Sequence, residues 1–162
     1  MSRFKNSLMT ACAAGLFCAD LLAGGFFLTL GNPVASHDPK AQGAVLLVRP
    51  DGCHNAVGAK VEGTAEGIVG GVRRSVTLDL TPLAAAGTYA VMHQWPAEGT
   101  WVVRLTARSD GRITSARVPV DADGFRRESA KRFPGEAPAD ALDAMLHGTT
   151  SGQVAATRLL LL

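Results

Sequence analysis

Apolar and polar residues alternate in short runs between residues 44 and 120, and this pattern predicts β-strands. In Val72–Leu80, for example, Val76, Leu78 and Leu80 alternate with polar residues, as in a strand with one face in water. The predicted strands are Ala44–Val48, Lys60–Glu66, Val72–Leu80, Thr88–Trp95, Thr100–Ala107 and Ile113–Val120. No helical period separates them, so the crossover helices of a parallel sheet are excluded. The expected fold is therefore all-β, an antiparallel sandwich of about six or seven strands.

Turn residues are found at the ends of these predicted strands. Arg49-Pro50-Asp51-Gly52 is predicted to end the first strand, and Asp110-Gly111 to join the last two. The segment from Trp95 to Trp101 is predicted to be a tight hairpin with a tryptophan at each shoulder. We expect the core to form around Tyr89, Trp95 and Trp101.

Two further regions flank the strands. Residues 123–162 are predicted to be a polar linker, a short helix over Pro138–Leu146 and a tail. Four basic residues of the linker, Arg126, Arg127, Lys131 and Arg132, are interpreted as a solvated face.

The first 36 residues have the three parts of a secretory signal. Arg3 and Lys5 precede an apolar stretch, Leu8–Leu30, and small residues lead to Ser36. We expect residues 1–36 to be a signal peptide cleaved after Ser36, or a membrane anchor that attaches the protein through residues 8–30. Both alternatives place the sandwich domain, residues 37–122, outside the cytoplasm, in the periplasm or beyond the cell.

Charge, cysteine content and the lack of catalytic motifs in the sequence argue against several classes of function. The 162 residues carry a formal net charge of +2, which does not indicate a nucleic-acid partner. Cys12 and Cys18 lie in the export segment, so Cys53 alone remains and no internal disulfide is expected. No nucleophile elbow, phosphate-binding glycine loop or metalloprotease helix is present in the sequence. We therefore expect a protein that is not an enzyme.

Four residues are candidate metal ligands. Cys53 and His54 follow a turn signal and offer a thiolate and an imidazole. The alternative interpretation is a small buried cysteine beside a surface histidine, since free cysteine is commonly buried. His37 would be the first residue of the chain cleaved after Ser36, where its amine and imidazole would suit Cu(II). The alternative is that it belongs to a disordered chain terminus without a ligand. His93 is either a helper ligand or a sheet histidine beside Trp95.

One stretch resembles a known family. Pro82-Leu83 followed by Gly87-Thr88-Tyr89-Ala90-Val91 is similar to a corner of exported immunoglobulin-like sandwiches, and loosely resembles the periplasmic copper-resistance carriers. The resemblance implies an immunoglobulin-like topology and a role in carrying copper. His37-Asp38-Pro39-Lys40 is similar to the start of those carriers but has Asp38 inserted, and their later Asp-x-His ligands have no counterpart.

Three functions follow from these observations. The first is an exported, non-enzymatic binding or accessory protein with no cofactor and an unknown protein partner. The alternative is a periplasmic copper carrier that uses His37 with Cys53, His54 or His93. The third is an enzyme with Cys53 as its nucleophile and a histidine as base.

Overall fold

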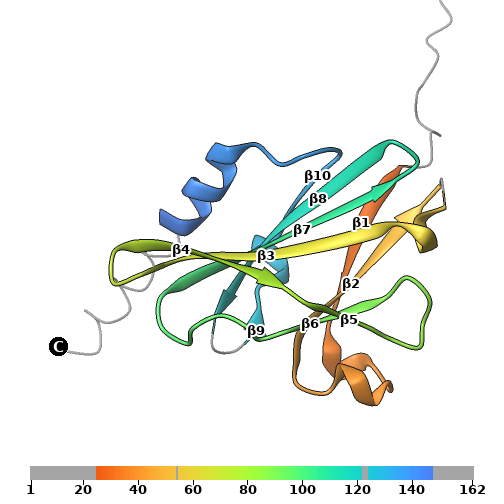
Figure 1. Cartoon of the computed structure of the whole chain (residues 1–162), viewed down its shortest axis with the longest axis horizontal. Coiled ribbons are helices and arrows are strands. Elements are labelled where there is room, and N and C mark those ends of the chain that lie inside the picture. Colours follow the sequence, from red (N-terminus) through yellow and green to blue (C-terminus); the bar gives the residue numbers. More distant parts are fainter. Residues whose placement is uncertain (1–24, 54, 122–123, 148–162) are drawn as a thin grey trace, which may run out of the picture.

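Two antiparallel sheets pack face to face in the computed structural model, which describes residues 25–53, 55–121 and 124–147 (Figure 1). The predicted all-β sandwich is thus confirmed. The first sheet has the strand order β1-β2-β6-β5, and the second has β10-β8-β7-β3-β4, with β9 paired to β8. The strands are β1 Phe26–Gly31, β2 Ala44–Gly52, β3 Lys60–Val69, β4 Val72–Leu78, β5 Leu80–Pro82, β6 Tyr89–Met92, β7 Thr100–Ser109, β8 Arg112–Asp121, β9 Gly124–Phe125 and β10 Lys131–Phe133.

β1 corrects the expected boundary at residue 36. It pairs along its whole length with β2, from Phe26 opposite Gly52 to Gly31 opposite Leu47. Phe26, Leu28 and Leu30 are at most 7% exposed and belong to the main core. The end of the apolar stretch Leu8–Leu30 is therefore a core strand rather than part of an export helix, and cleavage after Ser36 would remove it. The earlier part of that stretch lies outside the described residues.

Arginines from the second sheet's side of the sandwich cover the unpaired edge of β1. Arg132 donates from Nε to the carbonyl oxygen of Leu28 at 3.0 Å, and Arg127 donates from Nη2 to that of Leu30 at 3.0 Å. These bonds satisfy backbone acceptors that an edge strand otherwise leaves open. Two residues of the predicted solvated basic cluster thus have a structural role. The region predicted as a linker also contains β9 and β10.

The remaining predictions differ in detail. Pro50, which was predicted to end the first strand, lies inside β2 and is buried. The strand accommodates a proline there because β2 beyond Val48 pairs with β1 alone, so one of its edges needs no amide donor. The run Val72–Leu80 divides at Asp79, where the chain passes from β4 in the second sheet to β5 in the first. Gln94 binds both backbone groups of Asp79, at 3.0 and 2.9 Å, and so satisfies the polar groups at this crossing.

The segment from Trp95 to Trp101 is not a hairpin, since β6 and β7 belong to different sheets. The Asp110-Gly111 turn between β7 and β8 is confirmed, with φ values of 47° and 73° that suit a two-residue hairpin. The predicted helix is also confirmed, over residues 139–147. Three short 3₁₀ helices used below are η1 Pro33–Ala35, η2 Pro39–Ala41 and η4 Arg127–Ser129.

The core contains the predicted aromatic residues. Trp95 and Trp101 are 9% and 2% exposed, and Tyr89 packs against the same cluster. Trp101 lies directly opposite Gly67 in the β3–β7 register. A Cβ at residue 67 would run into the indole ring and into the carbonyl oxygen of Thr100, so only glycine leaves room for the ring there.

Candidate functional site

A pocket lies on the outer face of the first sheet. It has a volume of about 1010 Å³ and is formed under the β1–β2 loop, residues 32–43. Leu46 and Val48 of β2 face the core, and side chains alternate between the two faces of a strand. Leu47 and Arg49 therefore point outward, into the pocket. We call it the loop pocket. Its lining residues are Gly31, Asn32, Ala35, Ser36, His37, Asp38, Pro39, Lys40, Leu47, Arg49, Leu83, Ala84, Ala85, Thr88 and Arg127.

Two Asx-Pro dipeptides shape the loop above the pocket. The side chain of Asn32 accepts a hydrogen bond from the amide of Val34 at 3.0 Å and begins η1. The side chain of Asp38 accepts one from the amide of Lys40 at 2.9 Å and begins η2. Each proline follows its cap at the first helical position, where a missing amide hydrogen costs no hydrogen bond. The sequence thus specifies two short turns that fold the loop over the sheet.

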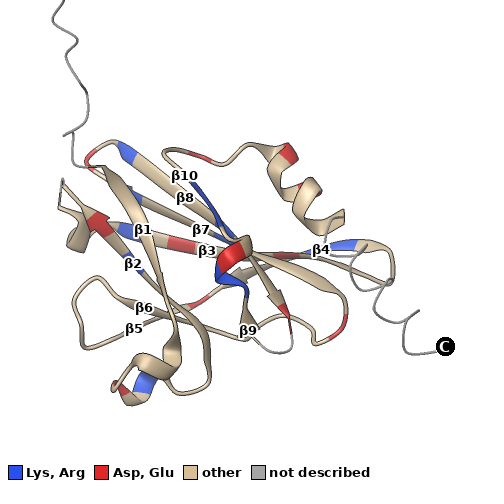
Figure 2. Cartoon of the chain, turned by 180° about the vertical axis from the view of Figure 1, so that it is seen from behind, with Lys and Arg blue, Asp and Glu red and all other residues tan. Residues whose placement is uncertain are grey.

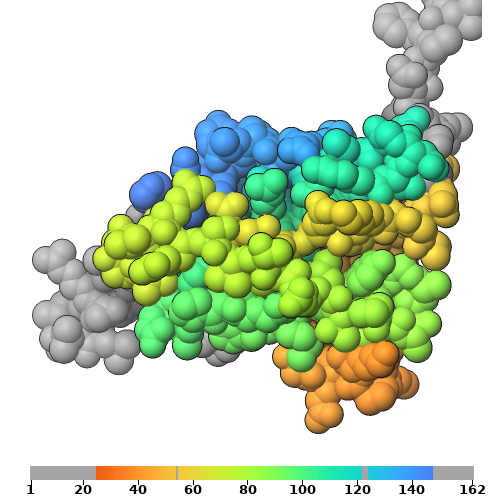
Figure 3. Space-filling model, viewed as in Figure 1, coloured from red at the N-terminus to blue at the C-terminus, as the bar shows by residue number. Residues whose placement is uncertain are grey.

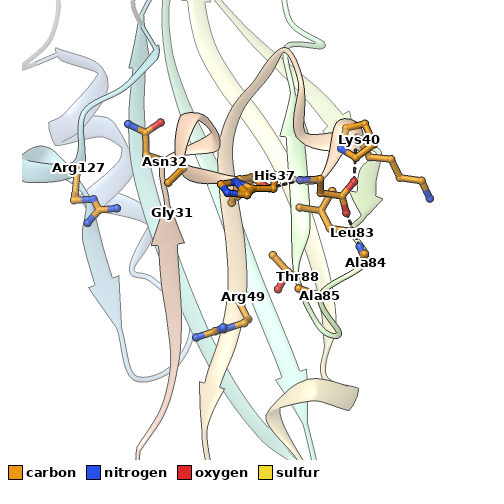
Figure 4. A pocket seen from close by; sticks show the side chains of 15 residues that line it. Gly31, Asn32, His37, Lys40, Arg49, Leu83, Ala84, Ala85, Thr88 and Arg127 are labelled. Carbon is orange, nitrogen blue, oxygen red and sulfur yellow. Dashed lines mark hydrogen bonds between the residues drawn. The ribbon is translucent and has the colours of Figure 1, made fainter.

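Asp38 also ties this loop to the β5–β6 loop. Its Oδ2 accepts a hydrogen bond from the amide of Ala84 at 2.6 Å, across 46 positions of sequence (Figure 4). The amides of Ala84 and Lys40 lower the pKa of Asp38 below its ordinary value of 3.8. Figure 3 shows the orange β1–β2 loop lying against the green part of the chain. One carboxylate therefore joins the two loops that border the pocket.

The lining combines apolar and basic groups. Leu47 and Leu83 contribute apolar surface, whereas His37, Arg49 and Arg127 bring nitrogen donors toward the pocket (Figure 4). Arg49 pairs with Asp51 at 3.0 Å, and its side chain remains 51% exposed. The hydroxyl oxygen of Thr88 is buried and has no hydrogen-bond partner in the structure. An occupant with an apolar body and an oxyanion would match these groups.

Two of the predicted metal ligands that the structure describes, Cys53 and His93, lie at opposite ends of β2. His37 is exposed in the loop between η1 and η2, and the fold keeps β1 before it, so it is not the first residue of the folded domain. Cys53 is exposed at one end of β2, whereas His93 follows Met92, which pairs with Ala44 at the other end. β2 has nine residues, so at a rise of ~3.3 Å per residue its two ends lie roughly 30 Å apart.

His93 instead packs on Trp95, with ring centroids 4.7 Å apart. His54 lies outside the described residues. Within residues 25–53, 55–121 and 124–147, no three histidine, cysteine, aspartate or glutamate side chains gather as a metal site. The same residues contain no helix that is long and apolar enough to cross a membrane.

Ser36, His37 and Asp38 are consecutive but do not form a nucleophile–base arrangement. The carboxylate of Asp38 accepts hydrogen bonds from the amides of Lys40 and Ala84. Ser36 Oγ accepts one from the amide of Asp38 at 3.2 Å. These bonds build the loop rather than activate Ser36, which would need hydrogen bonding to a base. The site is suited to binding.

Sequence reasoning missed Asp38, Arg49 and Arg127 as site residues. The Asn32-Pro33 and Asp38-Pro39 dipeptides are typical turn signals and could have predicted the loop. Arg127 reaches the pocket only through the packing of η4 beside β1, which no local pattern indicates.

Comparison with protein-family models, with curated proteins and with solved structures found no match for this chain. The resemblance to copper-resistance carriers therefore remains a hypothesis that rests on Pro82–Val91 and His37-Asp38-Pro39-Lys40.

We predict that Asp38→Ala loosens the β1–β2 loop. The amides of Lys40 and Ala84 lose their acceptor, so their hydrogen exchange should become several-fold faster by NMR. The exposed Asp140→Ala is the matched control and should leave both amides unchanged.

Protonation of Asp38 at low pH should likewise loosen the β1–β2 loop of the wild-type protein. Because the folded-state pKa of Asp38 is lowered, its contribution to stability is fully present above 3.8 and is lost as the pH falls through the folded-state pKa. Exchange at Ala84 that is the same in Asp38→Ala and wild type would contradict this role.

Proposed function

We propose that this chain is a non-enzymatic binding protein that acts outside the cytoplasm and takes its ligand into the loop pocket. The observation that carries the proposal is the pocket's construction. A loop with two capped turns is tied by Asp38 to the β5–β6 loop, above strand residues that are not needed for the core. Loops held by a rigid sandwich are common positions for binding sites.

The ligand we propose has an apolar body and a carboxylate or other oxyanion. Leu47 and Leu83 would contact its apolar part, and Arg49 with His37 would receive the charge. The unpartnered hydroxyl of Thr88 adds one hydrogen-bonding group at the pocket wall. The volume of about 1010 Å³ suits an organic molecule rather than a single ion.

The finer fold assignment, an immunoglobulin-like sandwich, is part of the same proposal. Two observations support it: the chain passes at Asp79 from β4 in the second sheet to β5 in the first, and Tyr89 packs against the core. The stretch Pro82–Val91, which carries the family resemblance, spans the β5–β6 connection that borders the pocket.

Export remains supported by the sequence before β1. Arg3 and Lys5 precede apolar residues that begin at Leu8, and the small residues Ala23, Gly24 and Gly25 come immediately before Phe26. Since β1 begins at Phe26, we propose processing just before it, not after Ser36. A retained membrane anchor made by the same apolar residues is the alternative.

Copper carriage is the second candidate function from the sequence. It required a free amine at His37 with Cys53, His54 or His93 as helpers. In the structure β1 precedes His37, and Cys53 and His93 lie at opposite ends of β2. We therefore propose the loop pocket as the ligand site, and copper binding is an alternative outcome of the test below.

We predict that octanoate binds the loop pocket more tightly than 1-octanol, which has the same chain length but no charge. Isothermal titration should show that Arg49→Ala weakens octanoate binding about threefold to tenfold, since an exposed ionic contact is worth little more. Binding of 1-octanol should be unchanged in this variant.

Arg74→Ala on β4 is the matched control, because Arg74 is exposed and does not line the pocket. Equal octanoate affinity in wild type and Arg49→Ala would contradict the proposed ligand chemistry. Stoichiometric Cu(II) binding that is lost in His37→Ala would support copper carriage instead.

We predict that the chain of residues 1–162, produced in a bacterium with a general secretory pathway, leaves the cytoplasm and begins between residues 24 and 26 after processing. Mass spectrometry of the periplasmic and membrane fractions measures both. An unprocessed protein in the membrane fraction would support the anchor, and one in the soluble cytosol would contradict export.

A further inference from the structure

A second pocket lies on the outer face of the second sheet, where the segment before the C-terminal helix and the helix itself cross β7 and β8. Its volume is about 360 Å³. We call it the arginine pocket. It is lined by Glu66, Arg73, Arg104, Thr106, Arg117, Glu136, Ala137, Ala139, Leu142 and Asp143.

The helix covers part of this face for a reason that the sequence makes clear. Leu142, Met145 and Leu146 form its apolar stripe and pack on Val102 of β7, with Ile68 of β3 at the border. Beyond this small apolar cluster the sheet face is charged, and the helix and its leading segment close over it. Arg117 and Glu66 are thereby withdrawn from water, whereas Arg73, Asp143 and Glu136 stay about half exposed.

Arg117 is the most buried of these charges. Its neighbours along β8, Ala116 and Val118, face the core, so Arg117 points to the outer face, yet it is only 4% exposed. Its Nε and Nη1 atoms are buried and have no hydrogen-bond partner in the structure. Buried guanidinium groups are almost always paired, because the desolvation of an unpaired charge is costly.

The carboxylates around Arg117 are bound by other arginines. Glu66 pairs with Arg73 at 3.1 Å and lies 3.7 Å from Arg104. Asp143 binds the same Arg73 at 2.8 Å, and Glu136 binds Arg108 at 2.6 Å. Figure 2 shows acidic and basic positions close together on β3, β7 and β8.

The register adds like charges next to Arg117. It lies directly opposite Arg104 on β7 and opposite Lys131 on β10, so three cations form one row across the sheet. Like charges directly opposite each other destabilise a sheet. Burial and the neighbouring Arg104 lower the pKa of Arg117, in keeping with a guanidinium that lacks a bonded anion.

We propose that the arginine pocket binds a small monovalent carboxylate, with Arg117 as its principal donor. The bound oxyanion would accept hydrogen bonds from the guanidinium and separate its charge from those of Arg104 and Lys131. Glu66, Glu136 and Asp143 surround the pocket and would repel a phosphate dianion. This site lies on the opposite sheet from the loop pocket and does not depend on the function proposed there.

The test uses the whole folded protein with ¹³C-labelled acetate as the probe. Acetate should raise the melting temperature above that in sodium chloride of equal ionic strength, and its NMR signal should broaden with the protein. Arg117→Met removes the charge while it keeps the apolar stem, so the variant should fold and bind acetate about tenfold more weakly. Arg74→Met, at an exposed position on β4, is the control and should bind like wild type.

Three results would overturn this proposal. One is no acetate response in the wild-type protein, which would mean that water alone fills the pocket. Another is an acetate response that Arg117→Met retains. The third is a response to phosphate at the same ionic strength with none to acetate, which would contradict the assignment of a monovalent carboxylate.

Discussion

The pairing of β1 with β2 is the interaction on which the rest of this structure depends. It places Phe26, Leu28 and Leu30 in the core between the sheets and makes Phe26–Gly31 one edge of the first sheet. Full burial of each large apolar side chain stabilises a fold by about 1.5–3 kcal/mol, so three of them contribute an amount comparable to the whole stability of a small domain. Arg127 and Arg132 then satisfy the carbonyl oxygens at the unpaired edge.

The position of the loop pocket follows from this pairing. The β1–β2 loop can fold over the outer face of the first sheet only because β1 and β2 anchor both of its ends there. Arg127 connects the two features, since it binds the carbonyl oxygen of Leu30 and also lines the pocket. The outer faces of the two sheets differ accordingly. One carries a pocket under a loop, and the other carries a charged surface closed by a helix.

Much of the fold could be predicted from local patterns. The alternation that begins at Val72, the Asp110-Gly111 turn and the helix after Pro138 each depend on nearby residues alone. The turn and the helix were found, and the strand was found as far as Leu78, where β4 ends. β1 was missed because its apolar residues continue the apolar stretch that begins at Leu8, and composition cannot separate a core strand from an export segment. The burial of Arg117 was missed for a different reason. It depends on the later segment of residues 135–143, which lies over the outer face of the second sheet beside Arg117.

The most direct test of this account compares the unfolding of two chains, residues 25–162 and residues 37–162, by circular dichroism in increasing urea. The account predicts a cooperative β-rich transition for the first chain. The second chain lacks β1 and should show no cooperative transition, because the core between the sheets is then open along one edge. A chain that starts at His37 and unfolds cooperatively with the same midpoint would contradict the central role of β1.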